Sequence, residues 1–216
     1  MLVTSTLPGE GKTGFATSYA ISVALEGSRV VVVDLDLRQP AVMRRLALPE
    51  PSAGVVEVLG GEADLGSTLV SLREVEVDIL PVASRPPVLA KLLQSQRLAD
   101  LIRQLKEAYD LVVLDSPPLL LVSDAQLVAP LADTAVMIVQ WQKTPRASVE
   151  RALSLLKQGG ASIAGAVLTQ VDLRRHAEYG YGDIGSYYKR YRSYYEQPEA
   201  SARPASGESY RTRTTA

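Results

Sequence analysis

The feature that most constrains the fold of this chain is a glycine loop close to its start. A short strand-like stretch from Leu2 runs into Pro8-Gly9-Glu10-Gly11-Lys12-Thr13, and a long segment with apolar residues at helical spacing follows. Strand, glycine loop and helix in that order form the context that a phosphate-binding loop requires. Glycines let consecutive backbone N–H groups face one anion, and the N-terminus of the following helix adds partial positive charge. The sequence therefore predicts a site for nucleotide phosphates at this loop.

Two side chains of the loop have expected roles toward a bound nucleotide. Lys12 would reach the β- and γ-phosphates, and the hydroxyl of Thr13 would be a ligand of Mg²⁺. The predicted cofactor-binding residues are Pro8, Gly9, Glu10, Gly11, Lys12, Thr13 and Gly14. The match is not strict, because the full pattern places a glycine five residues before Gly11 and this chain has Thr6 there. An ordinary glycine turn between a strand and a helix is the alternative interpretation of the loop alone.

Buried strands alternate with helical segments along the rest of the chain. Near-continuous apolar runs predict strands at 29–33, 111–114, 135–139 and 163–168, and an alternating pattern predicts one at 75–82. Helical spacing predicts long helices after the loop, at 89–105 and at 145–156, and short helices at 55–59 and 65–70. This order of elements predicts an α/β fold of the P-loop NTPase type, with a mainly parallel sheet flanked by helices on both faces.

Composition limits the classes of protein to which the chain can belong. Its 216 residues are 46% hydrophobic, which suits one globular α/β domain, and they include no cysteine. The lack of cysteine excludes disulfides, thiolate metal sites and cysteine nucleophiles. The net charge of -1 gives no electrostatic argument for a nucleic-acid partner. No apolar run approaches the roughly 18 residues of a membrane span and no signal peptide is recognisable, so we expect a cytoplasmic location.

The character of the sequence changes after Asp172. Aliphatic residues almost vanish from 176–196, which is dense in tyrosine, and 197–216 consists mostly of small polar residues, proline and arginine. Such a segment cannot bury enough apolar surface to order itself. We therefore expect a P-loop domain at 1–172 and a flexible tyrosine-rich tail at 173–216. Because the loop begins almost at Met1, we also expect either that the sheet starts here or that an upstream segment is missing.

Three aspartates lie at the ends of predicted buried strands. Asp34 and Asp36 follow the valine-rich strand, and Asp115 closes the strand at 111–114. Ligands of parallel α/β sheets bind beyond the carboxyl ends of the strands, so these acids should lie beside the phosphate loop. In extended backbone a spacing of two places Asp34 and Asp36 on one face, and clustered carboxylates repel one another unless a cation lies between them. The predicted ligands of Mg²⁺ are Thr13, Asp34, Asp36 and Asp115.

Three ordered motifs together resemble the bacterial tyrosine kinases of capsule and exopolysaccharide synthesis and export. They are Gly9-Glu10-Gly11-Lys12-Thr13, Val31-Val32-Val33-Asp34-Leu35-Asp36-Leu37-Arg38-Gln39-Pro40 and Tyr109-Asp110-Leu111-Val112-Val113-Leu114-Asp115-Ser116-Pro117-Pro118. The sequence between the motifs and the C-terminal tyrosine cluster are similar to the family as well. The resemblance covers roughly residues 1–196.

The resemblance implies an ATP- and Mg²⁺-dependent autokinase on a P-loop fold. Its catalytic residues would be Lys12, Asp34, Asp36 and Asp115, with Asp34 or Asp36 accepting the tyrosine proton and Asp115 completing the metal site. The phosphate acceptors would lie in the tail of a neighbouring subunit, at Tyr179, Tyr181, Tyr187, Tyr188, Tyr191, Tyr194 and Tyr195. The subunits would form a ring-shaped homo-oligomer if the upstream segment is present. A membrane-embedded regulator of polysaccharide chain length would activate the kinase and recruit it to the inner face of the cell membrane.

Three positions depart from the family pattern and leave other functions open. Gly14 stands where a second Ser or Thr is usual, and Ser18 and Thr169 stand where Asn is expected. A catalytically weak, nucleotide-sensing subunit of a polysaccharide export machine is therefore one alternative. A ParA- or MinD-type ATPase is another alternative, although this chain has Leu7 at the position of the signature lysine of that group. The mixture of aromatic and basic residues in the tail also fits a binder of single-stranded nucleic acid, but the balanced overall charge argues against it.

Overall fold

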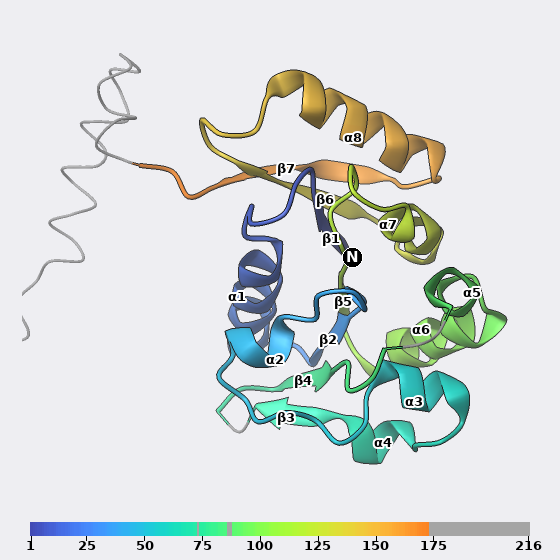
Figure 1. The fold of residues 1–216 in the computed structure, drawn as a ribbon. Helices are drawn as coiled ribbons and strands as arrows, with labels where there is room; N and C mark the ends of the chain where they lie inside the picture. Colours follow the sequence, from blue (N-terminus) through green and yellow to red (C-terminus); the bar gives the residue numbers. More distant parts are fainter. Residues whose placement is uncertain (73, 86–87, 173–216) are drawn as a thin grey trace, which may run out of the picture. The chain divides into compact units, whose positions relative to one another are not determined.

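The computed structural model describes residues 1–72, 74–85 and 88–172, and these contain one seven-stranded sheet (Figure 1). The strands are β1 Leu2–Ser5, β2 Val30–Asp34, β3 Val70–Leu72, β4 Val77–Leu80, β5 Leu111–Asp115, β6 Ala135–Gln140 and β7 Ile163–Thr169. Their order across the sheet is β3-β4-β2-β5-β1-β6-β7. All neighbouring strands are parallel except β3, which pairs antiparallel with β4 at one edge. The predicted mainly parallel α/β sheet is confirmed.

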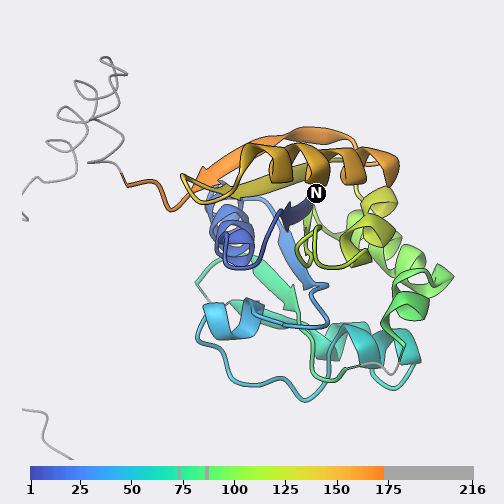
Figure 2. The ribbon, with the colours of Figure 1, turned by 45° about the horizontal axis from the view of Figure 1, so that its top comes forward.

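Helices cover both faces of the sheet (Figures 1 and 2). They are α1 Lys12–Leu25, α2 Val42–Arg45, α3 Val55–Gly60, α4 Leu65–Thr68, α5 Leu89–Leu93, α6 Gln96–Ala108, α7 Asp124–Val128 and α8 Arg146–Gln158, with a 3₁₀ turn at Ala129–Leu131. The strand β2 explains this layering, because all its valines are fully buried. Val31 and Val33 belong to the core beneath α3 and α5 to α8, whereas Val30 and Val32 belong to the core beneath α1 and α2.

The order of the strands brings the predicted site residues together. The strands β2, β5 and β1 lie side by side in the middle of the sheet and run in the same direction. Asp34 of β2 is directly in register with Asp115 of β5, and Asp115 is also in register with Val3 of β1. The glycine loop follows β1, so it leaves the sheet at the same carboxyl edge as the two acids.

Two predicted elements differ from the structure. The predicted helix at 89–105 is two helices, α5 and α6, because Ser95 ends one and begins the other: its hydroxyl donates to the carbonyl of Leu92 at 2.7 Å and accepts the N–H of Leu98 at 3.2 Å. The apolar spacing continues through this break and hides it. The predicted helix at 65–70 ends at Thr68, and Val70 begins the edge strand β3.

The tail predicted at 173–216, with its seven candidate acceptor tyrosines, lies outside the described residues. Within the chain, Met1–Val171 forms one compact unit. In the part of the chain that the structure describes, no helix is both long enough and apolar enough to cross a bilayer.

The cap at Ser95 provides a test of the α5–α6 boundary. Replacing an N-cap serine with alanine removes an acceptor for an unpaired helix N–H group, so we expect Ser95→Ala to lower the free energy of unfolding by about 1 kcal/mol. Urea unfolding followed by circular dichroism measures it. The exposed Ser154 inside α8 is the control, and Ser154→Ala should change stability by less than about 0.5 kcal/mol. Equal effects of the two substitutions would contradict the assigned cap.

Candidate active site

The glycine loop has the backbone conformation that phosphate binding requires. Gly9 and Gly11 have φ angles of 78° and 91°, in the left-handed region that residues with a Cβ rarely adopt. Gly11 occupies the N-cap position of α1, so the first N–H groups of this helix have no partner within it. Thr6, which replaces the first glycine of the strict motif, is fully buried and does not have a positive φ. The structure therefore places no demand for glycine at that position.

Glu10 ties the loop to two distant parts of the chain. The residue is 2% exposed, and Oε2 accepts the N–H of Leu7 at 2.8 Å while Oε1 accepts the hydroxyl of Thr144, just before α8. The backbone carbonyl of Glu10 accepts the hydroxyl of Thr169, the last residue of β7. These bonds hold the loop from the side of β6 and β7. The carboxylate and the carbonyl of Glu10 therefore hold the loop in shape, and a contact of Glu10 with the nucleotide stays a prediction.

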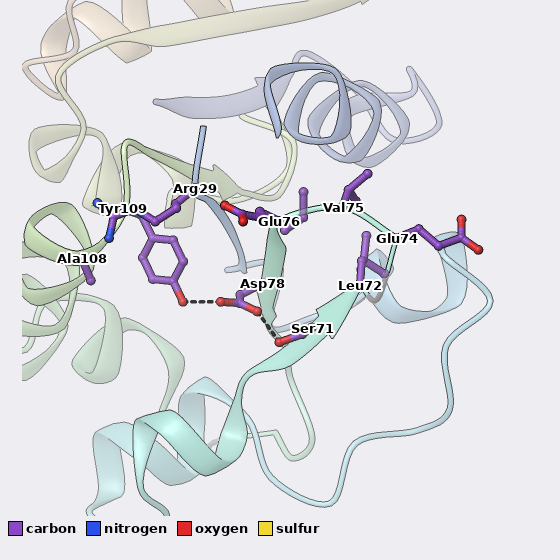
Figure 3. Close-up of a pocket in the computed structure, with 10 residues that line it drawn as sticks. Arg29, Ser71, Leu72, Glu74, Val75, Glu76, Asp78, Ala108 and Tyr109 are labelled. Atoms are coloured by element: carbon purple, nitrogen blue, oxygen red, sulfur yellow. Dashed lines mark hydrogen bonds between the residues drawn. The ribbon is translucent and has the colours of Figure 1, made fainter. Parts of the chain in front are cut away.

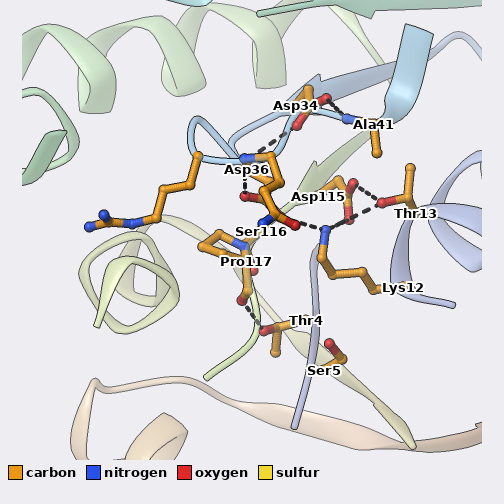
Figure 4. Close-up of polar contacts among 12 residues, drawn as sticks. Thr4, Ser5, Lys12, Thr13, Asp34, Asp36, Ala41, Asp115, Ser116 and Pro117 are labelled. Carbon is orange, nitrogen blue, oxygen red and sulfur yellow. Dashed lines mark hydrogen bonds and ion pairs between the residues drawn. The ribbon is translucent and has the colours of Figure 1, made fainter. Parts of the chain in front are cut away.

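Lys12 and Thr13 meet the predicted acids in a single polar cluster (Figure 4). The ammonium of Lys12 lies 2.9 Å from Asp36 Oδ2 and 3.6 Å from Asp115 Oδ1. The hydroxyl of Thr13 donates to Asp115 Oδ2 at 2.6 Å. Four residues from three separate segments therefore converge on one point, which an ordinary glycine turn does not explain.

Asp34 and Asp36 have different partners, although they are only two residues apart. The strand β2 ends at Asp34, so the alternation of an extended strand does not continue to Asp36. Asp34 accepts the N–H of Asp36 at 3.1 Å, and the N–H groups of Ala41 and Val42 at 3.0 and 3.1 Å. Asp36 instead faces Lys12 (Figure 4). The first acid thus fixes the turn into α2, and the second presents its carboxylate to the lysine.

Burial makes the charges of this cluster costly. Burial, and then the neighbouring Asp115, raises the pKa of Asp34 to about 7. Burial also raises the pKa of Asp115, against the opposing effect of Lys12. Burial alone would lower the pKa of Lys12, but the attraction of Asp115 and Asp36 outweighs it and the pKa is raised. The site holds more negative charge than one lysine balances.

Of the three carboxylates, that of Asp115 best fits a bound Mg²⁺. Its Oδ1 is buried and, within the described residues, accepts no hydrogen bond. Such an oxygen is an acceptor for a metal-bound water or a metal ion, and Mg²⁺ commonly keeps several waters while binding one or two carboxylates and the substrate phosphates. In residues 1–72, 74–85 and 88–172, no three acidic or histidine side chains could hold a metal directly. The geometry therefore fits a partly hydrated ion near Thr13 and Asp115 better than a cage of all three aspartates.

A cleft of about 360 Å³ opens between the glycine loop and α2. Its walls include the loop residues Pro8, Gly9 and 11–14, together with Asp36, Pro118 and Leu121. Arg44 of α2 also lines it, a residue that the sequence motifs did not indicate. The cleft therefore provides backbone N–H groups, a lysine and a second cation around the predicted phosphate site.

An ion pair that the sequence did not reveal joins the segment after Asp36 to the start of α7. Arg38 donates to both carboxylate oxygens of Asp124, at 2.7 and 3.2 Å, and the side chain of Asp124 is 5% exposed. Arg38 lies two residues after Asp36, whereas Asp124 begins α7 beyond the loop that follows Asp115. The pair therefore fixes the segment that carries Asp36 against the segment that follows Asp115.

A larger hollow, of about 700 Å³, lies at the other end of the sheet (Figure 3). Tyr109 donates its hydroxyl to Asp78 at 2.6 Å, and Asp78 also accepts the hydroxyl of Ser71. Arg29 and Glu76 lie close by, next to the amino ends of β2 and β4 (Figure 3). Ligands of parallel sheets bind at the carboxyl ends, so size alone does not make this hollow the active site.

The three departures from the family pattern lie in different surroundings. A Cβ on Gly14 would approach Arg45 Nε at 3.5 Å, an ordinary contact, so space does not require glycine there. Ser18 is exposed on α1. Thr169 uses its hydroxyl to hold the carbonyl of Glu10. None of the three residues is a member of the cluster around Lys12, so the departures leave that cluster in place.

The chain matches one domain family and is similar to several bacterial proteins. A family model described as an AAA domain matches residues 3–158. The chain is 33% identical to tyrosine-protein kinase YwqD of Bacillus subtilis over 181 residues, covering 84% of this chain and 76% of that protein. It is 32% identical to the succinoglycan biosynthesis transport protein ExoP of Rhizobium meliloti over 197 residues, covering 89% of this chain and 25% of that longer protein.

Solved structures resemble the chain over most of its length. The VpsO kinase domain superposes with a TM-score of 0.75 and 30% identity, covering 79% of this chain and 84% of that chain. The septum site-determining protein MinD of Pyrococcus horikoshii, solved with Mg-ADP, superposes with a TM-score of 0.66 and 24% identity, covering 77% of this chain and 68% of that chain. The likeness to MinD shows a shared fold alone.

The raised pKa of Asp34 predicts how stability depends on pH without nucleotide or metal. Between about pH 4 and pH 7 the folded chain binds a proton that the unfolded chain has lost, so this carboxyl makes the folded state less stable as pH rises. We expect it to contribute a loss of roughly 2–4 kcal/mol across that window. Urea unfolding from pH 4 to pH 8, for the wild type and Asp34→Asn, measures the difference in slope.

The difference in slope isolates the carboxyl, whatever Asp34→Asn does to stability at a single pH. Glu62→Gln removes an exposed carboxylate and is the control for the loss of one negative charge. Parallel stability curves for the wild type and Asp34→Asn would rule out the burial assigned to this group.

Proposed function

The chain belongs to the bacterial tyrosine kinases, and from that premise we propose that it phosphorylates the tyrosine cluster near its own C-terminus, in trans, using ATP and Mg²⁺. The observation that carries the proposal is the convergence of Lys12, Thr13, Asp36 and Asp115 beside a glycine loop in a phosphate-binding conformation. The family relation gives the class of reaction, and this cluster is where we locate the chemistry.

The residues of the cleft would have separate roles in phosphoryl transfer. Backbone N–H groups from Gly11 to Thr13 would bind the phosphates, and Lys12 would exchange its contacts with Asp36 and Asp115 for phosphate oxygens. The acceptor phenol has a pKa near 10, so it reacts more readily when a carboxylate takes its proton. Asp34 or Asp36 would serve as that acceptor.

The metal site would neutralise charge on the nucleotide. When bound, Mg²⁺ would offset the negative charge of the β- and γ-phosphates during transfer. Thr13 and Asp115, which already share a hydrogen bond of 2.6 Å, would hold it, and Oδ1 of Asp115, which accepts no hydrogen bond within the described residues, would accept one from the hydration shell of the ion. Phosphoryl transfer of this kind depends mainly on positioning and electrostatics, which a rigid cluster at the sheet edge supplies.

The biological setting that we propose is the control of polysaccharide synthesis and export. One relative is named for succinoglycan biosynthesis transport, which supports a role of this kind. A membrane-embedded regulator of chain length would activate the kinase and bring it from the cytoplasm to the inner face of the membrane. A ring of subunits would present the tail of one chain to the cleft of the next. Each added phosphate carries about −1.5 to −2 charge at pH 7, so heavily phosphorylated tails would repel one another and loosen the ring.

The proposal is tested by detection of phosphotyrosine after incubation with ATP and Mg²⁺. The wild type, Lys12→Ala and a chain truncated before Tyr179 are compared, each with and without a cytoplasmic segment of a candidate activator. We expect a signal in the wild type that falls at least about 100-fold in Lys12→Ala, because the phosphates lose their principal cation. The truncated chain should give no signal by itself but should phosphorylate a full-length Lys12→Ala chain added in trans.

Two controls make the test decisive. Arg151→Ala changes an exposed residue on α8 outside the cleft, so it should retain wild-type activity. Circular dichroism confirms that each variant is folded. Binding of ATP with no phosphotyrosine under any condition would contradict the autokinase and favour a nucleotide-sensing subunit.

A further inference from the structure

Arg44 lies between two hollows of the surface. It lines the cleft of about 360 Å³ beside the glycine loop, and it also lines a second hollow of about 570 Å³ on the other side of α2. Of the residues that the structure describes, no other lines both. The helix α2 is anchored by the fully buried Val42, whereas the side chain of Arg44 is exposed. The anchored helix thus presents one cation to both spaces.

Within the described residues, Arg44 is a cation that forms no ion pair. Its side chain makes no hydrogen bond or ion pair within the described residues, whereas the ammonium of Lys12 already contacts Asp36 and Asp115. Asp34, Asp36 and Asp115 give the site an excess of carboxylates. A nucleoside triphosphate brings still more negative charge, which a single Mg²⁺ does not fully neutralise. A guanidinium matches phosphate oxygens well because it offers several N–H donors in a fixed plane.

The second hollow has the chemistry of a site for an aromatic side chain. Its walls include Pro40, Met43, Leu48, Pro51 and Val82, and the carboxylates of Asp34 and Glu50 are among the lining groups. A phenol ring needs an apolar surface for its faces and polar groups near its hydroxyl. Apolar walls close to a carboxylate and a guanidinium meet both needs. The hollow also lies next to the phosphate cleft, where an acceptor must approach.

We propose that Arg44 binds the phosphoryl group that is transferred, and that the second hollow holds the ring of the acceptor tyrosine. This inference rests on the function proposed above. The phenol oxygen forms a bond to the γ-phosphorus, and the bond from that phosphorus to the β–γ bridging oxygen breaks. ADP leaves with the bonding electrons, and the phenol proton passes to Asp34 or Asp36. Arg44 contacts the γ-phosphate before transfer and the phosphotyrosine after it.

Nucleotide binding tests the role of Arg44 without relying on activity. The affinities of Mg-ADP and of Mg²⁺ with a non-hydrolysable ATP analogue are measured by calorimetry for the full-length wild type, Arg44→Ala, Arg44→Lys and Arg45→Ala. We expect Arg44→Ala to weaken binding of the triphosphate about tenfold or more and binding of the diphosphate less than about twofold, because only the triphosphate has the contacted group. Arg44→Lys should recover part of the loss.

Arg45 is a matched control from the same turn of the helix. It is also an exposed arginine, but its guanidinium lies near Gly14 of α1, and it lines neither hollow. Arg45→Ala should bind both nucleotides as the wild type does. Equal weakening of the diphosphate and triphosphate in Arg44→Ala, or equal effects of the two arginine substitutions, would overturn the assignment of Arg44.

Steady-state kinetics test the second hollow. The acceptor is a synthetic peptide of residues 176–195, and the enzyme is the full-length chain or its variant Ala83→Trp, which places a bulky ring at an exposed wall of the hollow. We expect KM for the peptide to rise at least about fivefold while nucleotide affinities stay unchanged. Ala147→Trp, an equally bulky change on an exposed part of α8, should alter neither.

The outcomes separate this inference from the proposed function. A loss of nucleotide affinity in Ala83→Trp with an unchanged KM for the peptide would mean that the hollow holds the base, and would overturn the assignment. If the wild type phosphorylates nothing, the proposed kinase reaction and the acceptor site both fail. The comparison of diphosphate with triphosphate still decides whether Arg44 binds the γ-phosphate.

Discussion

The site depends on one partly buried cation among three buried carboxylates. Lys12 lies within 3.6 Å of two of them, and its ammonium is held so strongly that their attraction outweighs the effect of burial on its pKa. A cluster with this imbalance favours any ligand that brings a divalent cation. It also explains why an anionic nucleotide and a metal would bind together rather than separately, since each offsets the charge that the other introduces.

The fold supplies this cluster through the register of adjacent strands. Asp34 and Asp115 are neighbours because β2 and β5 are parallel and in register, and the loop after β1 leaves the sheet at the same edge. The valines of β2 are fully buried on both faces, and they fix that register because a slip of one residue would put the charged Arg29 or Asp34 where a buried valine now lies. The precision of the polar site is thus a consequence of apolar packing beneath it.

Some parts of the site could be predicted from the sequence because their signals are local. The loop, Lys12 and Asp115 lie in short motifs at predictable strand ends, and the parallel sheet follows from the alternation of apolar runs and helical segments. The contacts of Arg38 with Asp124 and of Thr144 with Glu10 could not be predicted, because they join residues 86 and 134 positions apart. Arg44 belongs to no motif, and only the folded surface places it beside two hollows. The break at Ser95 was hidden because the apolar period continues through it.

The hydrogen bond between Thr169 and Glu10 gives the last strand a mechanical connection to the phosphate loop. Thr169 ends β7 four residues before the segment that leads to the tyrosine cluster, and its hydroxyl holds a carbonyl inside the loop. A displacement of that strand end must move the loop or break this bond. The side chain of Gln170 adds a second bond, to the carbonyl of Gly9 at 2.7 Å. Tension applied to the chain beyond residue 172 therefore has a short, direct route to the groups that would bind the nucleotide.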